Sequence, residues 1–188
     1  MSPSLAHDIA APSPWVLRFA SLLPPGAEVL DLASGRGRHA RYLAAAGCRV
    51  VAADRNAEAI ASLTGVAGVA GCVLDLESGA PWPWAAGSFD AVVVTNYLHR
   101  PAFARLCDLL RPGGVLIYET FMQGNAAFGK PSNPDFLLAP GELLVRTADG
   151  FTVIAFEQGE VARPAPAMIQ RICARKGETA GRLPEPSA

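Results

Sequence analysis

Residues 29–56 read VLDLASGRGRHARYLAAAGCRVVAADRN. An apolar run reaches Asp31, two glycines follow at Gly35 and Gly37, and a second apolar run ends in Asp54. Glycine lets the backbone turn sharply and lets a ligand approach it closely. A strand, a glycine turn, a helix and a second strand in this order predict a unit that can hold a nucleotide-like ligand at the turn.

The rest of the chain continues this alternation of strand and helix. Nearly continuous apolar runs are typical of parallel strands that are buried on both faces, so the pattern predicts a doubly wound α/β sheet. The expected strands are 28–33, 49–54, 72–76, 89–95, 115–120, 151–158 and 167–175, and the expected helices are 13–23, 38–46, 57–63, 101–110 and 141–148. The last two strands are joined by a segment too short for a parallel crossover, so we expect them to be antiparallel.

Composition indicates a single globular domain. The chain has 188 residues, of which 51% are hydrophobic and 18% charged, with a formal net charge of −1. We expect a flexible N-terminus over residues 1–12, one domain over 13–175 and a disordered tail over 176–188. No long apolar segment or basic leader is present, which predicts a soluble cytoplasmic protein. The four cysteines are far apart, which favours buried thiols, and no histidines have ligand spacing, so we expect no metal.

The acid at the end of the second apolar run points to a ribose. Asp54 lies 19 residues after Gly35, and a carboxylate there can accept hydrogen bonds from both ribose hydroxyls. NAD fits this pattern as well, because Ala40 completes a G-x-G-x-x-A match.

Two further acids favour a cationic nucleoside over a dinucleotide. Asp31 precedes the glycines, where a dinucleotide would place its pyrophosphate, whereas a ligand with an ammonium and a sulfonium group tolerates or favours a carboxylate. Asp75 lies at the end of the third predicted strand, 72–76, and could accept a hydrogen bond from an adenine amino group. Each residue also has a structural interpretation: the glycines as a tight turn, Asp31 as a helix cap and Asp75 as a solvated strand end.

Three segments carry a resemblance to a known family. VLDLASGRGRHARYLAAAG resembles the first motif of class I S-adenosylmethionine-dependent methyltransferases, APWPWAAGSFDAVVVTNYLH resembles the segment leading into their fourth strand, and LLRPGGVLIYET resembles their fifth. Within that superfamily the chain is similar to the small tellurite-resistance-type bacterial members. The resemblance covers residues 27–175 and implies a Rossmann-like, seven-stranded, mostly parallel sheet with an antiparallel last strand.

The resemblance also implies S-adenosyl-L-methionine as the cofactor and assigns its contacts. Asp31 and Gly35 would line the methionine part, with Gly37 in the same turn, and Asp54 would bind the ribose. The remaining implied cofactor contacts are Arg55, Asp75 and Leu76 at the adenine and Asn96 near the sulfonium. Ala33 departs from the family, which has its first glycine there, and this narrows the approach to the methionine end.

Candidates for the acceptor side follow the fourth and fifth strands. Tyr97 and His99 are the candidate catalytic residues, since histidine can serve as a base near neutral pH, although His99 could instead pack against the next helix. The long segment 121–140 should lie on the ligand side, where Phe121, Phe128 and Lys130 could cover an acceptor. The alternative is a rigid connection with the phenylalanines as a small satellite core.

The leading hypothesis is a methyltransferase that transfers methyl in line to a small molecule. A non-catalytic S-adenosylmethionine-binding or regulatory module is one alternative, and an NAD(P)-linked oxidoreductase is another. A nucleic acid or protein acceptor stays open, because a net charge of −1 argues only mildly against it. We expect no membrane partner.

Overall fold

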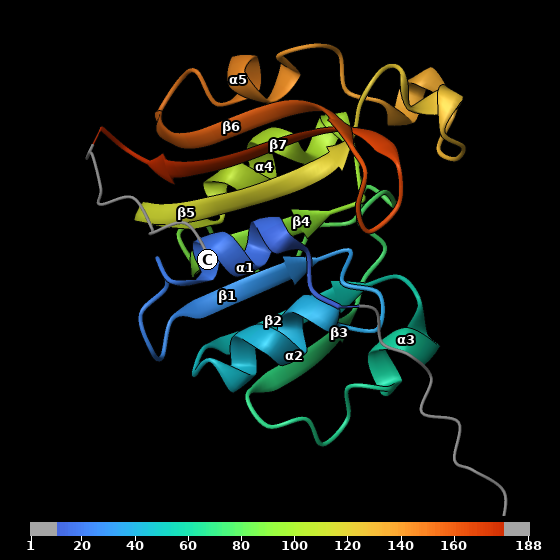
Figure 1. Cartoon of the computed structure of the whole chain (residues 1–188). Helices are drawn as coiled ribbons and strands as arrows, with labels where there is room; N and C mark the ends of the chain where they lie inside the picture. The colour runs from blue at the N-terminus through green and yellow to red at the C-terminus, as the bar shows by residue number, and fades with distance from the viewer. Residues whose placement is uncertain (1–10, 179–188) are drawn as a thin grey trace, which may run out of the picture.

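The computed structural model describes residues 11–178 and contains one seven-stranded sheet with the strand order β3-β2-β1-β4-β5-β7-β6 (Figure 1). The strands are β1 Glu28–Leu32, β2 Arg49–Asp54, β3 Val69–Val73, β4 Phe89–Thr95, β5 Leu110–Phe121, β6 Phe151–Val161 and β7 Ala167–Lys176. The helices are α1 Pro14–Ala20, α2 Arg38–Ala45, α3 Ala57–Ala61, α4 Phe103–Asp108 and α5 Glu142–Arg146, with short 3-10 helices at Arg100–Ala102, Asn125–Ala127 and Pro134–Phe136. The five strands β1 to β5 pair in parallel, and β7 is antiparallel to both of its neighbours. This confirms the predicted fold class.

Helices cover both faces of the sheet (Figure 1). On one face, apolar side chains of α1, α2 and α3 pack on β1, β2 and β4, for example Trp15, Leu43 and Ile60. On the other face, α4 and α5 pack on β4, β5 and β7 through residues such as Phe103 and Leu143. The fully buried side chains of β1 and β4 explain why these strands read as continuous apolar runs.

Local capping sets where the first helices begin. Ser13 accepts a hydrogen bond from the Trp15 backbone N–H and precedes Pro14 at the first helical position, as the sequence predicts for α1. Asn56 caps α3 in the same way through the Ala59 N–H. Both helices are shorter than predicted, since α1 ends at Ala20 and α3 at Ala61.

The third strand lies three residues earlier than predicted. The sequence predicted 72–76, but β3 spans Val69–Val73 and pairs with β2 so that Val50 faces Val69 and Asp54 faces Val73. It is an edge strand of small side chains, VAGCV, none of which is fully buried. Gly71 lies so close to Ile60 that a Cβ atom would be 2.7 Å from the Ile60 side chain. The larger side chains Leu74 and Leu76 follow the strand, and Asp75 is not a strand residue.

Other boundaries also differ from prediction, two of them for identifiable reasons. The helix expected over 101–110 is divided into a 3-10 turn and α4, and Leu110 already pairs with Phe89 in the sheet before a bulge at 111–114. Lys176 belongs to β7 rather than to a tail, because its ammonium donates to the carbonyls of Cys107 and Leu110. The rest of the expected tail from residue 179, and the expected flexible N-terminus up to residue 10, lie outside the described residues.

Among residues 11–178, no helix is both long enough and apolar enough to cross a lipid bilayer.

Candidate active site

The glycine turn follows β1 at the point where the strand order reverses. Ala33, Gly35 and Gly37 all have positive φ angles, of 54°, 54° and 71°. Glycine adopts this backbone without strain, whereas alanine does so at a cost of about 1–2 kcal/mol. Gly37 is further restricted, because a Cβ atom there would lie 2.6 Å from the side chain of Leu63. The turn therefore needs its glycines for shape, and Ala33 is held in a strained conformation.

Asp54 joins this turn to the end of β2. One carboxylate oxygen accepts the Gly35 N–H at 2.8 Å, and the other accepts the Asn56 N–H at 2.8 Å. An ionised carboxylate offers about four acceptor positions, so roughly two stay available to a ligand. The Asp54 side chain is thus fixed in place by backbone contacts from both sides before any ligand binds.

Asp31 lies beneath the first turn of α2, fully buried. It accepts a hydrogen bond from the Ala40 N–H at 3.0 Å, so the structural interpretation of Asp31 as a cap holds. Burial is the main reason that the pKa of Asp31 rises to about 7, and the Ala40 hydrogen bond and the charge of Arg38 only partly offset it. A carboxylate buried here therefore lowers the stability of the fold.

His39 adjoins Asp31 and is a structural residue. Its Nε2 accepts the Ser13 N–H at 3.1 Å, and its Nδ1 lies 3.5 Å from the Thr95 hydroxyl and 3.9 Å from Asp31. Burial, with a smaller effect from Arg38, lowers the pKa of His39 to about 3, so the ring is neutral. As predicted, His39 lies at the start of α2, and it cannot act as a base near neutral pH.

Two cavities open at the carboxyl ends of the parallel strands. The first cavity has a volume of about 440 Å³ and lies over the ends of β1, β2 and β4; its walls are Ala33, Asp54, Arg55, Leu74, Asp75, Leu76, Glu77, Asn96, Tyr97, Leu98, Thr120, Phe121, Pro131 and Phe136. Three carboxylates against one arginine make it acidic. The second cavity has a volume of about 500 Å³, and its walls are residues 11–14, Arg38, Asn96, Glu119, Phe121, Asn125, Phe128, Lys130, Val161, 163–167, Ile169 and Arg171.

The two cavities meet at Asn96 and Phe121, which line both. Asn96 follows β4 and has a φ of 55°, a conformation that asparagine tolerates better than most residues. Phe121 ends β5. A ligand that fills the first cavity therefore ends close to one that fills the second, with these two residues at the junction.

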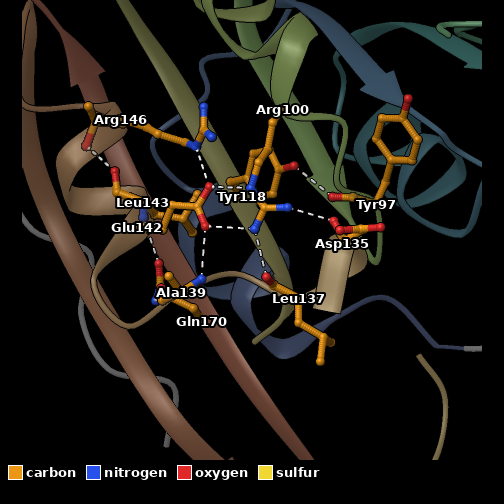
Figure 2. A network of polar contacts seen from close by, with 11 residues as sticks. Tyr97, Arg100, Tyr118, Asp135, Leu137, Ala139, Glu142, Leu143, Arg146 and Gln170 are labelled. Atoms are coloured by element: carbon orange, nitrogen blue, oxygen red, sulfur yellow. Dashed lines mark hydrogen bonds and ion pairs between the residues drawn. The ribbon is translucent and has the colours of Figure 1, made fainter. Parts of the chain in front are cut away.

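The segment after β5 is anchored at both ends. Asn125 is buried; its side-chain amide donates to the Pro131 carbonyl and accepts the Met168 N–H of β7, each at 3.0 Å. At the other end, Arg100 donates to the carbonyls of Asp135 and Leu137, as Figure 2 shows. Residues 126–134 therefore lie between two fixed points.

Arg100 is itself held by a carboxylate on α5. Glu142 binds Arg100 through both of its oxygens, at 2.8 and 2.9 Å, and also accepts from Arg146 at 2.7 Å and from the Ala139 N–H at 2.9 Å (Figure 2). Burial alone would raise the pKa of Glu142, but these hydrogen bonds outweigh it and lower the pKa to about 2. The network thus fixes the segment after β5 to α5.

The structure brings together most of the predicted site residues. The first cavity gathers Ala33, Asp54, Arg55, Asp75, Leu76, Asn96 and Tyr97; the second gathers Phe128 and Lys130; Phe121 belongs to both. Asp31, Gly35 and Gly37 line neither cavity, although Gly35 contacts Asp54 directly. The predicted placement of 121–140 on the ligand side is correct. The segment does not lie wholly on the acceptor side, since Pro131 and Phe136 face the first cavity.

The two candidate catalytic residues are not placed as a base would be. His99 lines neither cavity and lies between β4 and the following 3-10 turn. Tyr97 faces the first cavity, where its hydroxyl donates to Glu77 at 3.2 Å. Burial, and then the charge of Glu77, raise the pKa of Tyr97, so a phenolate does not form near neutral pH. Trp82 is buried, and Trp84 packs edge-on against Trp82 and Phe89, so this pair is part of the apolar core.

Several wall residues were missed from the sequence. Glu119 and Thr120 follow the apolar part of β5, so their position at a parallel strand end could have identified them. Arg38 and Arg163 gave no local signal, because the first reads as a helix-start residue and the second lies in a short connection that only the fold brings to the site. Within the described part of the chain, no three His, Cys, Asp or Glu side chains are grouped as metal ligands.

Comparison with known proteins identifies the fold. Residues 29–114, from β1 through the turn before the apolar part of β5, match the family described as "Methyltransferase domain". Over this stretch the chain is similar to methyltransferases. It is 39% identical over 106 residues to a demethylmenaquinone methyltransferase of Beutenbergia cavernae, a match that covers 52% of this chain and 42% of that protein. The chain thus spans less than half the length of this relative.

Solved structures agree with this assignment at the level of the fold. TehB from Haemophilus influenzae superposes with a TM-score of 0.74 at 20% identity, covering 90% of this chain and 64% of TehB. A 1,6-didemethyltoxoflavin-N1-methyltransferase of Burkholderia thailandensis, solved with S-adenosylhomocysteine, superposes with a TM-score of 0.63 at 24% identity. The match covers 87% of this chain and 76% of that protein.

Proposed function

We propose that this methyltransferase-fold chain transfers a methyl group from S-adenosylmethionine to a small-molecule acceptor. The observation that carries the proposal is the pair of adjoining cavities at the carboxyl ends of the strands, one acidic and one largely apolar, which meet at Asn96 and Phe121. Ligands of open α/β sheets bind at this edge. Both volumes fall in the range of small-molecule sites.

The first cavity suits the adenosine part of the cofactor. Asp54 has about two acceptor positions left for the ribose hydroxyls, and Asp75 and Leu76 lie where they can contact the adenine. Tyr97 and Glu77 would add an aromatic surface and a further acceptor. The methionine part would then extend past Asn96 toward the glycine turn.

Asp31 argues against a dinucleotide. Phosphate binding at a helix N-terminus needs free N–H groups in the first turn, and Asp31 uses the N–H of Ala40, the third residue of α2. A buried carboxylate beside this turn repels a pyrophosphate and attracts an ammonium. This supports S-adenosylmethionine over NAD, despite the G-x-G-x-x-A match.

The chemistry makes modest demands on the chain. When bound, S-adenosylmethionine supplies a methyl group already activated by a sulfonium leaving group. The residues at the junction have to align the acceptor with that methyl group and exclude water. Phe121 and Phe128 supply apolar surface for this purpose, and neither Tyr97 nor His99 is required as a base.

A non-catalytic S-adenosylmethionine-binding module is the alternative. Such a module needs the first cavity but has no need of a second one opening onto the sulfonium side, so the second cavity favours the enzyme. Two relatives are named for methylating small ring compounds, demethylmenaquinone and 1,6-didemethyltoxoflavin, which supports a small acceptor.

Calorimetry followed by a labelled-methyl screen tests the proposal. We expect S-adenosylmethionine and S-adenosylhomocysteine to bind with micromolar dissociation constants and NAD to bind poorly. Binding of NAD with no response to either S-adenosyl compound would disprove the cofactor. Binding of S-adenosylmethionine without methyl transfer to any member of a broad small-molecule panel would favour the non-catalytic module.

A further inference from the structure

We propose that the second cavity selects an acceptor that is largely apolar and carries an anionic group such as a carboxylate, held by Lys130 and Arg163. This inference rests on the proposed function and specifies its substrate class. The two residues come from different segments: Lys130 from the segment after β5, and Arg163 from the connection between β6 and β7. The fold alone brings their charges to one cavity.

The charge of the second cavity is strongly unbalanced. Its walls hold four cationic side chains, of Arg38, Lys130, Arg163 and Arg171, and a single acid, Glu119. Glu119 is already engaged, because it accepts from the Ser13 hydroxyl at 2.7 Å and from Arg171 at 3.1 Å. Its charge is therefore used within the protein and does not neutralise the other three cations.

Among the described residues, neither Lys130 nor Arg163 has an acidic partner within 4.0 Å, and neither side chain makes a hydrogen bond. Both are exposed at the rim of the cavity. Within residues 11–178, seven of the other twelve arginines form an ion pair with an acid, for example Arg111 with Asp90 at 2.6 Å. Two unpaired cations at the rim of one cavity create a positive potential that attracts an anion.

Most of the remaining wall residues are apolar. They include Phe121, Phe128, Ile169, Pro164 and Pro166. A small inorganic anion would leave this surface without a partner, whereas a molecule with an apolar body and one anionic group satisfies both parts of the wall. The body would reach the junction at Asn96 while the anion stays at the rim.

The cofactor does not account for these two cations. Arg38 begins α2, next to the glycine turn, where the carboxylate of the methionine part would compete for it. Neither Lys130 nor Arg163 lies in the glycine turn, and neither side chain is among the walls of the first cavity. The proposal therefore rests on these two residues alone.

Three probes of one shape and different charge test the inference: 2-naphthoate, 2-naphthamide and 2-naphthylmethylammonium. Each is titrated by calorimetry into the full chain saturated with S-adenosylhomocysteine. We expect 2-naphthoate to bind at least about tenfold more tightly than the amide, because its carboxylate can form charge-assisted contacts with the two cations. Solvent at the exposed rim weakens such contacts and limits the size of the difference. The ammonium should bind most weakly.

Variants assign the preference to the two residues. In Lys130→Met/Arg163→Met the carboxylate and the amide should bind equally, and Lys130→Glu/Arg163→Glu should favour the ammonium. Arg49→Gln is the control, because Arg49 is exposed and lies at the amino end of β2, beside Glu28 and at the opposite end of the strands from the cavities. This variant should keep the wild-type preference.

Equal binding of 2-naphthoate and 2-naphthamide to the wild type would overturn the inference, as would a preference that survives in the double methionine variant. Titration of S-adenosylhomocysteine by itself comes first. If that ligand fails to bind, the proposed function fails, and the three probes are then compared on the ligand-free protein. A carboxylate preference there that depends on Lys130 and Arg163 would still support the anion site.

Discussion

Replacement of Asp54 by alanine is the most direct test of the cofactor site. The variant removes the carboxylate that would accept hydrogen bonds from both ribose hydroxyls, each worth about 1.5–3 kcal/mol when the acceptor is charged. Two bonds at the lower figure amount to about 3 kcal/mol, or roughly a hundredfold in the dissociation constant. Asp54 is partly exposed, so water replaces some of this, and we expect a loss of at least about tenfold.

The fold has to be monitored in the same experiment, because Asp54 also accepts the backbone N–H groups of Gly35 and Asn56. Circular dichroism and thermal unfolding report this, and calorimetry with S-adenosylhomocysteine reports binding. Asp149→Ala is the control: it removes an exposed carboxylate that lines neither cavity, and its affinity should equal that of the wild type. A folded Asp54→Ala protein with an unchanged dissociation constant would refute the assignment.

Three further predictions concern the backbone strain at Ala33, the wall of the second cavity and the hydrogen bonds of Glu142. Ala33→Gly should raise the free energy of unfolding in urea by up to about 1 kcal/mol, since it relieves a φ of 54° but adds chain entropy; no increase would mean that Ala33 is unstrained. Phe128→Ala should leave the affinity for S-adenosylhomocysteine unchanged and slow methyl transfer, whereas the exposed-surface control Val145→Ala should change neither; a loss of cofactor affinity would contradict the placement. Glu142→Gln should destabilise the protein at pH 7, because the lowered pKa of Glu142 contributes stability that is full above about pH 4.5 and is lost as pH falls toward about 2. Urea unfolding at pH 7 and pH 3 should show that the difference in unfolding free energy between wild type and variant shrinks with acidification. A difference that stays constant would exclude the Arg100 ion pair as its cause.

Local signals in the sequence were sufficient for most of the sheet. The bounds of β2 and β4 were predicted to the residue, because both are central strands buried on two faces and therefore read as unbroken apolar runs. The edge strand β3 was predicted three residues too late because the segment that pairs with β2 contains Gly71 and only small side chains, while Leu74 and Leu76 after it line a cavity. These larger side chains drew the prediction toward residues that lie outside the sheet.

The two halves of the site differ in how far they could be predicted. Asp54 was identified because it ends a predicted parallel strand, and Asn96 was implied by the resemblance to the methyltransferase family; both line the first cavity. The interpretation of Asp31 as a helix cap is confirmed by its contact with the Ala40 N–H, but its complete burial was not predicted. The charge of the second cavity depends on Arg163, which reaches the site only through the antiparallel pairing of β6 and β7.

The anchoring of the segment after β5 has a consequence for how such an enzyme can diverge. Asn125 ties one end to β7 and Arg100 ties the other end to α5, so neither anchor depends on the identity of residues 126–134 between them. Those residues include Phe128 and Lys130 of the second cavity, whereas Asp54 and the glycine turn stand on other elements. Sequence change can therefore accumulate in residues 126–134 and alter the preference of the proposed acceptor cavity, while the proposed cofactor site and the sheet stay unchanged.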